Sequence, residues 1–212
     1  MIRPRVLLAD DHCLLLAAFK TLLEPCCEVV GTVTDGRQLL AAAPDLKPDV
    51  IVLDMAMPLL NGLEAGRRLK HMMPHIKLIY VTVNQDPDFA QEAYDIGASG
   101  YLLKSSAASE LFHAIQEVRQ GRRYITPLIA EKMEERFIQG SNRKAGASDL
   151  TQRQREVLQL LAEGHSMKQV AVILRVTPRT VAFHKYRIME DYQLKSNADL
   201  VRFAIHQGTV SS

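Results

Sequence analysis

Residues 50–58 read VIVLDMAMP, a short apolar run that ends in an aspartate. Four successive apolar residues closed by a polar one are typical of a strand buried on both faces of a parallel sheet. Similar runs occur on either side of this stretch. Together they predict five strands, over Val6–Ala9, Val29–Val33, Val50–Leu53, Leu78–Val81 and Tyr101–Leu103.

Between these runs, apolar residues recur at three- and four-residue spacing, as on one face of a helix. The spacing predicts helices over Leu14–Leu23, Gly36–Ala43, Leu63–Met72, Phe89–Ile96 and Ser109–Arg119. Strands that alternate with helices in this way favour an open, five-stranded, doubly wound parallel sheet with helices on both faces. Ligands of such sheets bind at the edge formed by the carboxyl ends of the strands.

Polar residues stand at the expected carboxyl ends of four strands: Asp10 with Asp11, Asp54, Thr82 and Lys104. Carboxylates brought together repel one another, so we expect a divalent cation between them. Their hard oxygen ligands favour Mg²⁺. One carboxylate is then available as a nucleophile, and Thr82 and Lys104 are placed to receive the charged oxygens of an incoming phosphoryl group.

In this order, these residues resemble the receiver domain of the two-component response regulators. The matching set is Asp10-Asp11, Asp54-Met55-Ala56-Met57-Pro58, Asn61-Gly62, Thr82 and Gly100-Tyr101-Leu102-Leu103-Lys104. The resemblance implies a flavodoxin-like fold in which Asp54 is the phospho-acceptor. It also implies an Mg²⁺ site held by Asp11, Asp54 and the backbone carbonyl of Ala56. Asp10 would support that site.

The resemblance assigns the neighbouring switch residues as well. Thr82 and Lys104 would bind the phosphoryl oxygens, and the orientation of Tyr101 would follow that of Thr82. Two positions depart from the family pattern. Ser105 stands where many receivers have proline, so a cis peptide bond there is not expected from proline chemistry. Asn84 lies where receivers vary and tune the lifetime of the phosphoryl group.

The pattern after residue 149 is purely helical. Capping residues precede four runs of helical spacing, at Thr151, Ser166, Thr177 and Ser196. The four helices are expected to end near Gly164, Leu174, Asp191 and Gln207. Two helices joined by a tight turn, the second beginning at Pro178, outline a helix-turn-helix. This part of the chain therefore predicts an all-α, four-helix DNA-binding domain.

The third of these helices has an outward face that can reach a major groove. On helical spacing, that face contains Arg179, Ala182, Lys185 and Tyr186, opposite Val181 and Ile188. Residues 150–208 resemble the C-terminal helix-turn-helix of LuxR and NarL-type regulators, with matches that include Thr180-Val181 and His184-Lys185. The resemblance implies DNA-facing or groove-side positions for Thr180, Val181, His184 and Lys185, beside the outward Arg179.

Composition is that of a globular protein. The 212 residues are 47% hydrophobic and 24% charged, which argues against a disordered, collagen-like or disulfide-stapled chain. Cys13, Cys26 and Cys27 lack the paired spacing of a zinc site or a redox motif, so we expect core thiols. No apolar run approaches the roughly 18 residues of a membrane span, and no signal-type stretch follows Met1, so we expect a soluble, cytoplasmic protein with no membrane partner.

Charge divides the chain into three parts. Residues 1–121, the expected receiver, hold 11 Lys and Arg against 15 Asp and Glu, a net charge of −4. Residues 122–148, an expected linker with a short helix from Pro127 to Ile138, and residues 149–212, the expected DNA-binding domain, each have a net charge of +3. An acidic front and a basic back indicate that nucleic-acid contacts belong to the back.

The sequence therefore predicts a response regulator of the NarL/FixJ kind, activated by phosphoryl transfer to Asp54. It would be a sequence-specific transcription regulator rather than an enzyme, although its receiver would assist its own phosphorylation and dephosphorylation. The expected partners are a sensor histidine kinase, double-stranded promoter DNA and a second copy of the chain. An apolar stripe of Ala198, Val201 and Ile205 on the last helix is either the dimer seam or a contact within its own domain.

Two alternatives from other classes stay open. One is a phosphoryl-transfer enzyme with an aspartyl-phosphate intermediate. Phosphatases of that kind have a second aspartate two residues after the first, where this chain has Ala56. The other is a receiver that acts only through protein contacts, with a tail that never touches DNA.

Overall fold

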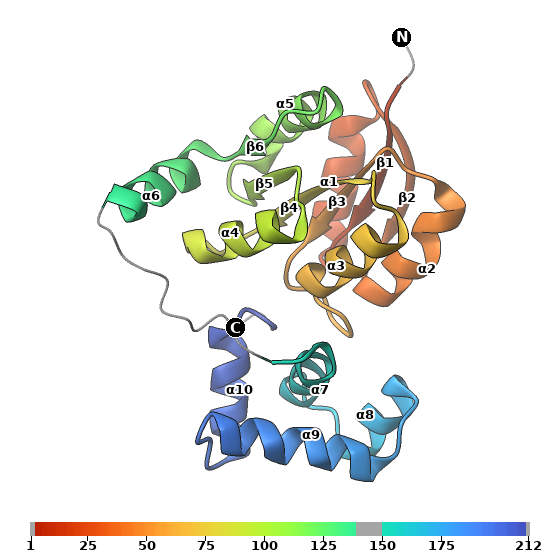
Figure 1. Ribbon diagram of the computed structural model, residues 1–212. Coiled ribbons are helices and arrows are strands. Elements are labelled where there is room, and N and C mark those ends of the chain that lie inside the picture. The colour runs from red at the N-terminus through yellow and green to blue at the C-terminus, as the bar shows by residue number, and fades with distance from the viewer. Residues whose placement is uncertain (1–2, 139–149, 211–212) are drawn as a thin grey trace. The chain divides into compact units, whose positions relative to one another are not determined.

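The computed structural model describes residues 3–138 and 150–210 of the chain. These residues form two compact units, an α/β unit in the first range and a helical unit in the second (Figure 1). Both expected fold classes are confirmed. None of the helices in these two ranges combines the length and the apolarity that a bilayer span requires.

The α/β unit contains a parallel sheet with the strand order β2-β1-β3-β4-β5-β6. Its strands are β1 (Arg5–Ala9), β2 (Glu28–Val33), β3 (Val50–Asp54), β4 (Lys77–Thr82), β5 (Gly100–Leu103) and β6 (Tyr124–Ile125). Strands β1, β3 and β4 are buried along nearly their whole length, which explains their almost unbroken apolar sequence. The five strands expected from the sequence are all present, and β6 is an addition.

The sequence pattern does not predict β6, because two residues are too few to show the alternation that identifies a strand. They pair in parallel with Gly100 and Tyr101 of β5. The helix that follows, α6 (Pro127–Ile138), packs against α4 (Pro87–Ile96). The first unit therefore continues past residue 121, into the segment expected to be a linker. Gly140 and Gly146, which we expect from the sequence to leave the C-terminal part of the chain free to reorient, lie outside the described residues.

Helices cover both faces of the sheet. Besides α4, they are α1 (Cys13–Leu23), α2 (Gly36–Leu46), α3 (Gly62–Met72) and α5 (Ala107–Arg119). Phe19 of α1 and Ile115 of α5 share one core cluster with strand residues such as Val52, so these two helices cover the same face. The other face is covered by α2, α3 and α4 (Figure 1).

The helical unit consists of four helices: α7 (Gln152–Ala162), α8 (Met167–Leu174), α9 (Pro178–Asp191) and α10 (Asn197–His206). The caps expected at Thr151, Ser166, Thr177 and Ser196 are confirmed, since each side chain accepts a backbone N–H of the first helical turn. Two apolar clusters hold the unit together. One joins α7, α8 and the start of α9, and the other joins α7, the end of α9 and α10.

Candidate functional site

Four neighbouring strands bring polar residues to one edge of the sheet. Asp10 follows β1, Asp54 ends β3, Thr82 ends β4 and Lys104 follows β5. Asp10, Asp54 and Thr82 are almost completely buried, with at most 4% of their surface exposed. Parallel strands end in the same direction, so the fold itself assembles this group. The convergence expected from the sequence is thereby confirmed for these four residues.

Lys104 lies between the two buried carboxylates. Its Nζ is 2.8 Å from Asp10 Oδ2 and 3.0 Å from Asp54 Oδ2. Burial alone would lower the pKa of Lys104, but the hydrogen bond to Asp10 and the charge of Asp54 outweigh it and raise that pKa. The ammonium is therefore charged, and it is in place to follow any negative charge that builds up on Asp54.

The Asp54 carboxylate is difficult to keep ionised. Burial raises its pKa above the ordinary value and the nearby Asp10 adds to the rise, while the charge of Lys104 and a hydrogen bond from the backbone of Ala56 oppose it. The Lys104 ammonium thus faces two buried carboxylates, those of Asp10 and Asp54. Its single positive charge leaves one negative charge at the site, which a second cation would neutralise.

The donor set fits a hard divalent ion. Ligand atoms of Asp10, Asp11, His12 and Asp54 all lie within 4.8 Å of one another. Three of these residues offer carboxylate oxygens, which Mg²⁺ prefers. The expected role of the Ala56 carbonyl stays a prediction. His12 is a further neighbour of this cluster that the sequence did not predict. Its ring Nδ1 is 3.0 Å from Asp10 Oδ1 and 2.8 Å from Asp11 Oδ1.

The loop after Asp54 explains why Asn61 and Gly62 follow it. The Asn61 side chain caps α3 by accepting the N–H of Glu64 at 2.9 Å. A Cβ atom at Gly62 would lie 2.1 Å from the carbonyl oxygen of Asp54, so a side chain at this position would displace the backbone of the site. The Gly62 N–H donates to the carbonyl of Met55 at 2.8 Å, which closes the loop.

Thr82 and Tyr101 meet through the loop that follows β4. The Thr82 hydroxyl oxygen accepts the N–H of Asn84 at 3.1 Å, and the Tyr101 hydroxyl donates to the Asn84 carbonyl at 3.4 Å. The Tyr101 ring is completely buried. No peptide bond among the described residues is cis, and the one before Ser105 accordingly is trans. The two switch residues expected from the sequence are thus linked by Asn84.

The outward face of α9 holds most of the expected DNA-facing residues. Arg179 is exposed, and Thr180, His184 and Lys185 are partly exposed. The expected DNA-facing role of Val181 is wrong, because its side chain is completely buried in the cluster that joins α7, α8 and α9. Its side chain packs inside the domain, where it holds α9 in place.

Two protein families match the chain. Residues 6–116 match the response regulator receiver domain, and residues 148–204 match the luxR family of bacterial regulatory proteins. The first match alone covers more than half of the chain. The chain belongs to the two-component response regulators of the NarL/FixJ type. This response regulator is accordingly a phosphorylation-dependent, DNA-binding transcription regulator.

Relatives of this response regulator match it over nearly their full length. Response regulator GacA of Pseudomonas aeruginosa is 32% identical over 210 residues, 98% of each chain. Response regulator UvrY of Escherichia coli is 30% identical over 96% of this chain and 94% of its own. A structure of RcsB from Salmonella enterica serovar Typhimurium, bound to the promoter P1flhDC with the phosphomimetic BeF₃⁻, is 25% identical, with a TM-score of 0.61 over 95% of this chain and 98% of that one.

The outward face of α9 in this response regulator includes two exposed residues that the sequence did not single out. Phe183 is 66% exposed, and Arg187 is exposed one turn further along α9. Phe183 escaped notice because a large apolar residue is expected to face a core. Its spacing of four residues from Arg179 and from Arg187 was the available signal. The Phe183 ring meets His184 edge-on at 5.4 Å between centroids.

His184 is held toward its neutral form. Burial lowers the pKa of its imidazole, and the charge of Arg153 lowers it further. A neutral imidazole has one nitrogen that donates and one that accepts a hydrogen bond. His184 can therefore bond either a phosphate oxygen or a base edge, whereas the positively charged Lys185 suits phosphate.

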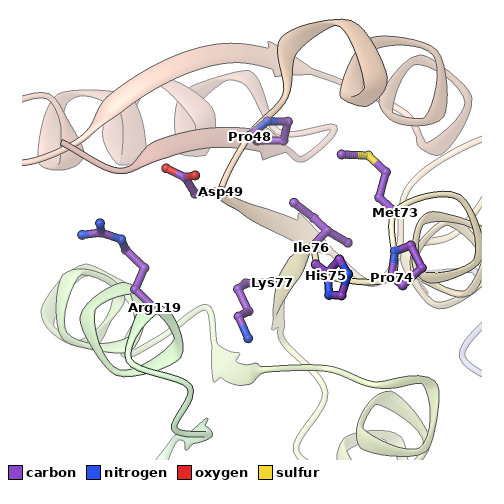
Figure 2. Close-up of a pocket in the computed structure, with 8 residues that line it drawn as sticks. All are labelled: Pro48, Asp49, Met73, Pro74, His75, Ile76, Lys77 and Arg119. Atoms are coloured by element: carbon purple, nitrogen blue, oxygen red, sulfur yellow. The ribbon is translucent and has the colours of Figure 1, made fainter. Parts of the chain in front are cut away.

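A surface pocket of about 490 Å³ lies at the opposite edge of the sheet of this response regulator, where β3 and β4 begin (Figure 2). It is lined by Pro48, Asp49, Met73, Pro74, His75, Ile76, Lys77 and Arg119. The Asp49 carboxylate accepts the N–H of Arg5 at 2.8 Å and so helps to fix the start of β1. None of the expected site residues lines this pocket.

Proposed function

We propose that Asp54 accepts a phosphoryl group from a sensor histidine kinase and that the phosphorylated receiver increases DNA binding by the helical unit. The observation that carries the proposal is the position of Asp54 at the end of the central strand β3, with the Lys104 ammonium 3.0 Å from its Oδ2. Asp10 is a poorer acceptor, because His12 contacts its Oδ1 and Lys104 contacts its Oδ2.

The proposed transfer forms one bond and breaks another. A carboxylate oxygen of Asp54 attacks phosphorus, while the phosphorus–nitrogen bond of a phosphohistidine breaks and the imidazole leaves. Lys104 then pairs with the new phosphoryl oxygens, and the Thr82 hydroxyl turns to donate to one of them. The Lys104 charge and the hydroxyl dipole of Thr82 then both stabilise the negative charge on the phosphoryl oxygens.

Asp11, Asp54 and the Ala56 carbonyl would hold Mg²⁺, with Asp10 in support, and the ion would supply charge neutralisation between the acceptor and the incoming phosphoryl group. The chemistry of the donor set supports this assignment, since three carboxylates meet beside a single ammonium. Chelation of divalent ions should therefore abolish the phosphorylation of Asp54.

A small phosphodonor tests the acceptor. The full chain incubated with acetyl phosphate and Mg²⁺ should gain one phosphoryl group in an intact-mass measurement. Asp54→Asn should gain none, and Asp45→Asn, which alters an exposed carboxylate in α2, should behave as the wild type. Undiminished labelling of the Asp54→Asn variant would falsify the assignment.

The proposal also specifies how the helical unit contacts DNA. A homodimer would place α9 of each copy in the major groove at two half-sites about one helical turn apart. Two observations support this arrangement. One face of α9 is exposed, and the structurally similar RcsB was solved bound to a promoter. Lys185 would contact phosphate, while the exposed Phe183 ring would contact a thymine methyl group, as apolar side chains do in the major groove.

Two substitutions on α9 separate these contacts. Lys185→Ala should weaken specific and non-specific DNA alike and reduce the slope of log affinity against log salt by about one. Phe183→Ala should weaken only the specific site and leave the salt slope unchanged. Binding isotherms at several salt concentrations measure both effects. Equal losses on specific and random DNA for Phe183→Ala would contradict the proposed base contact.

A further inference from the structure

Helix α6 is held at its two ends by the chain segments around two loops that leave the phosphorylation site. It lies beside α4 (Figure 1) and is the last described element before residue 150. One of the two loops begins directly after Thr82 and the other directly after Lys104. A helix attached to both is in a position to respond to both residues that are proposed to contact the phosphoryl group.

The C-terminal half of α6 is tied to the loop after Thr82 and to the first turn of α4, which follows that loop. Arg136 Nη1 is 2.8 Å from Asp88 Oδ1 and 3.5 Å from Asp86 Oδ1. One turn earlier, Lys132 Nζ donates to Gln85 Oε1 at 3.0 Å. Polar contacts from two successive turns thus fix α6 to residues 85–88. These side chains are exposed or partly exposed, so water competes for their contacts and each ion pair stabilises the present position only modestly.

The N-terminal end of α6 is tied to strand β5 and to the loop that follows it. Thr126, the residue before the helix, is buried, and its backbone N–H donates to the Tyr101 carbonyl at 3.0 Å. Its hydroxyl oxygen accepts the Leu103 N–H at 3.2 Å and lies 3.4 Å from Ser106 Oγ. This end is anchored by buried contacts, so it acts as the fixed end of the helix.

The C-terminal half of α6 is the end that can move, and a hydrogen bond between Asn84 and Thr82 connects the segment that holds it to the Asp54 site. The Asn84 N–H, at the start of the loop that holds Arg136, donates to the Thr82 hydroxyl oxygen at 3.1 Å. If Thr82 turns its hydroxyl toward a phosphoryl group, the Asn84 N–H loses this acceptor. Residues 84–88 must then rearrange, and their contacts with Lys132 and Arg136 depend on their present position.

We propose that α6 is a latch whose C-terminal half is released when Asp54 carries a phosphoryl group. This inference rests on the proposed function, because it takes the position of Thr82 as the signal. Release loosens Lys132 and Arg136 from residues 85–88 while Thr126 keeps the start of α6 on the sheet. The C-terminal half of α6 thereby gains freedom only in the phosphorylated state.

Hydrogen exchange of the full chain tests the latch, with beryllium fluoride and Mg²⁺ as the mimic of the phosphoryl group. Loss of surface ion pairs of this kind corresponds to roughly two- to fivefold faster exchange. We expect this increase at the amides of residues 132–138 on addition of the mimic, and no increase at residues 127–130. Fluorine NMR reports in the same sample whether the mimic has bound.

Variants break the latch without the mimic. Arg136→Glu reverses the charge that faces Asp86 and Asp88, and Asp88→Asn weakens the same pair from α4. Both should give the faster exchange of residues 132–138 in the free protein, and the mimic should add little to it. Lys20→Glu makes the same charge change as Arg136→Glu on the exposed side of α1 and should behave as the wild type.

The outcomes separate the latch from the function on which it rests. Bound mimic with unchanged or slower exchange at residues 132–138 overturns the latch and leaves phosphorylation of Asp54 standing. Failure of the mimic to bind the wild-type protein contradicts the proposed function and the latch together. Wild-type exchange in both Arg136→Glu and Asp88→Asn also overturns the latch, because it shows that these ion pairs do not hold α6.

Discussion

Gly66 on α3 and Tyr80 on β4 illustrate how closely single residues fit around the core. A Cβ atom at Gly66 would lie 1.8 Å from the Tyr80 hydroxyl oxygen. Tyr80 is completely buried, and its hydroxyl has no hydrogen-bond partner within the described residues. Burial accordingly raises the pKa of Tyr80 far above its ordinary value. The hydroxyl thus occupies the space that glycine leaves open.

This contact predicts a pair of substitutions that compensate each other. Gly66→Ala should lower the free energy of unfolding by about 1–3 kcal/mol, as overpacking of a core does. Tyr80→Phe should be nearly neutral, because it removes a buried hydroxyl that has no partner. Urea unfolding of the full chain measures both. The double variant should recover most of the loss, and full additivity of the two changes would show that strain elsewhere is responsible.

Single residues could be predicted from the sequence where chain direction alone decides their position. Asp54 and Lys104 follow buried strands, so the sheet brings them together whatever their side-chain conformations. Val181 could not be placed in this way. Family resemblance favours the groove and helical spacing favours the core, and only the packing of α7 and α8 around α9 decides for the core.

Helix α10 has two apolar faces. Leu200 and Ala204 are buried and join the cluster with α7 and α9. Ala198 and Ile205 are exposed and Val201 is partly exposed, so the stripe expected from the sequence is not covered by its own domain. An apolar stripe beside a complete core is available to a second copy of the chain.

Ile205 therefore tests the proposed dimer on DNA. Ile205→Asp should weaken binding to a two-fold site by about tenfold, the effect of losing a contact worth roughly 1.4 kcal/mol, and should leave binding to a single half-site unchanged. Gel shifts with full and half sites compare the two. His206→Asp introduces the same charge at the adjacent position of α10. Equal effects of the two variants would mean that charge near DNA, rather than the stripe, is responsible.

Elements could be predicted where caps and periodicity agree. The four helices of the helical unit begin where Thr151, Ser166, Thr177 and Ser196 predict, since each cap satisfies backbone N–H groups that the helix leaves unpaired. The attachment of α6 to the receiver could not be predicted, because its contacts with residues 85–88 join parts of the chain about 50 residues apart.

Two schemes could link phosphorylation of the receiver to DNA binding, and they predict opposite results for the DNA affinity of the isolated helical unit. If the unphosphorylated receiver masks α9, the isolated tail of residues 148–212 should bind DNA more tightly than the full chain. If phosphorylation acts through dimerisation, the isolated tail should bind weakly. We favour dimerisation, because a receiver of net charge −4 attracts a tail of net charge +3 only modestly.

Fluorescence anisotropy with a two-fold site, combined with analytical ultracentrifugation, distinguishes these schemes. The phosphorylated full chain should become dimeric and bind DNA more tightly than the isolated tail or the unphosphorylated protein. Asp54→Asn treated with the same phosphodonor provides the control. Equal affinity and equal mass with and without phosphodonor would contradict both schemes.

Strand β6 also limits where the molecule can be cut. Its pairing with Gly100 and Tyr101 covers the side of β5 that would otherwise be the open edge of the sheet. An uncovered edge strand offers its N–H and C=O groups to strands of other molecules. A receiver fragment that stops at residue 121 would expose this edge to such pairing, so a fragment that keeps β5 covered extends at least through Ile125.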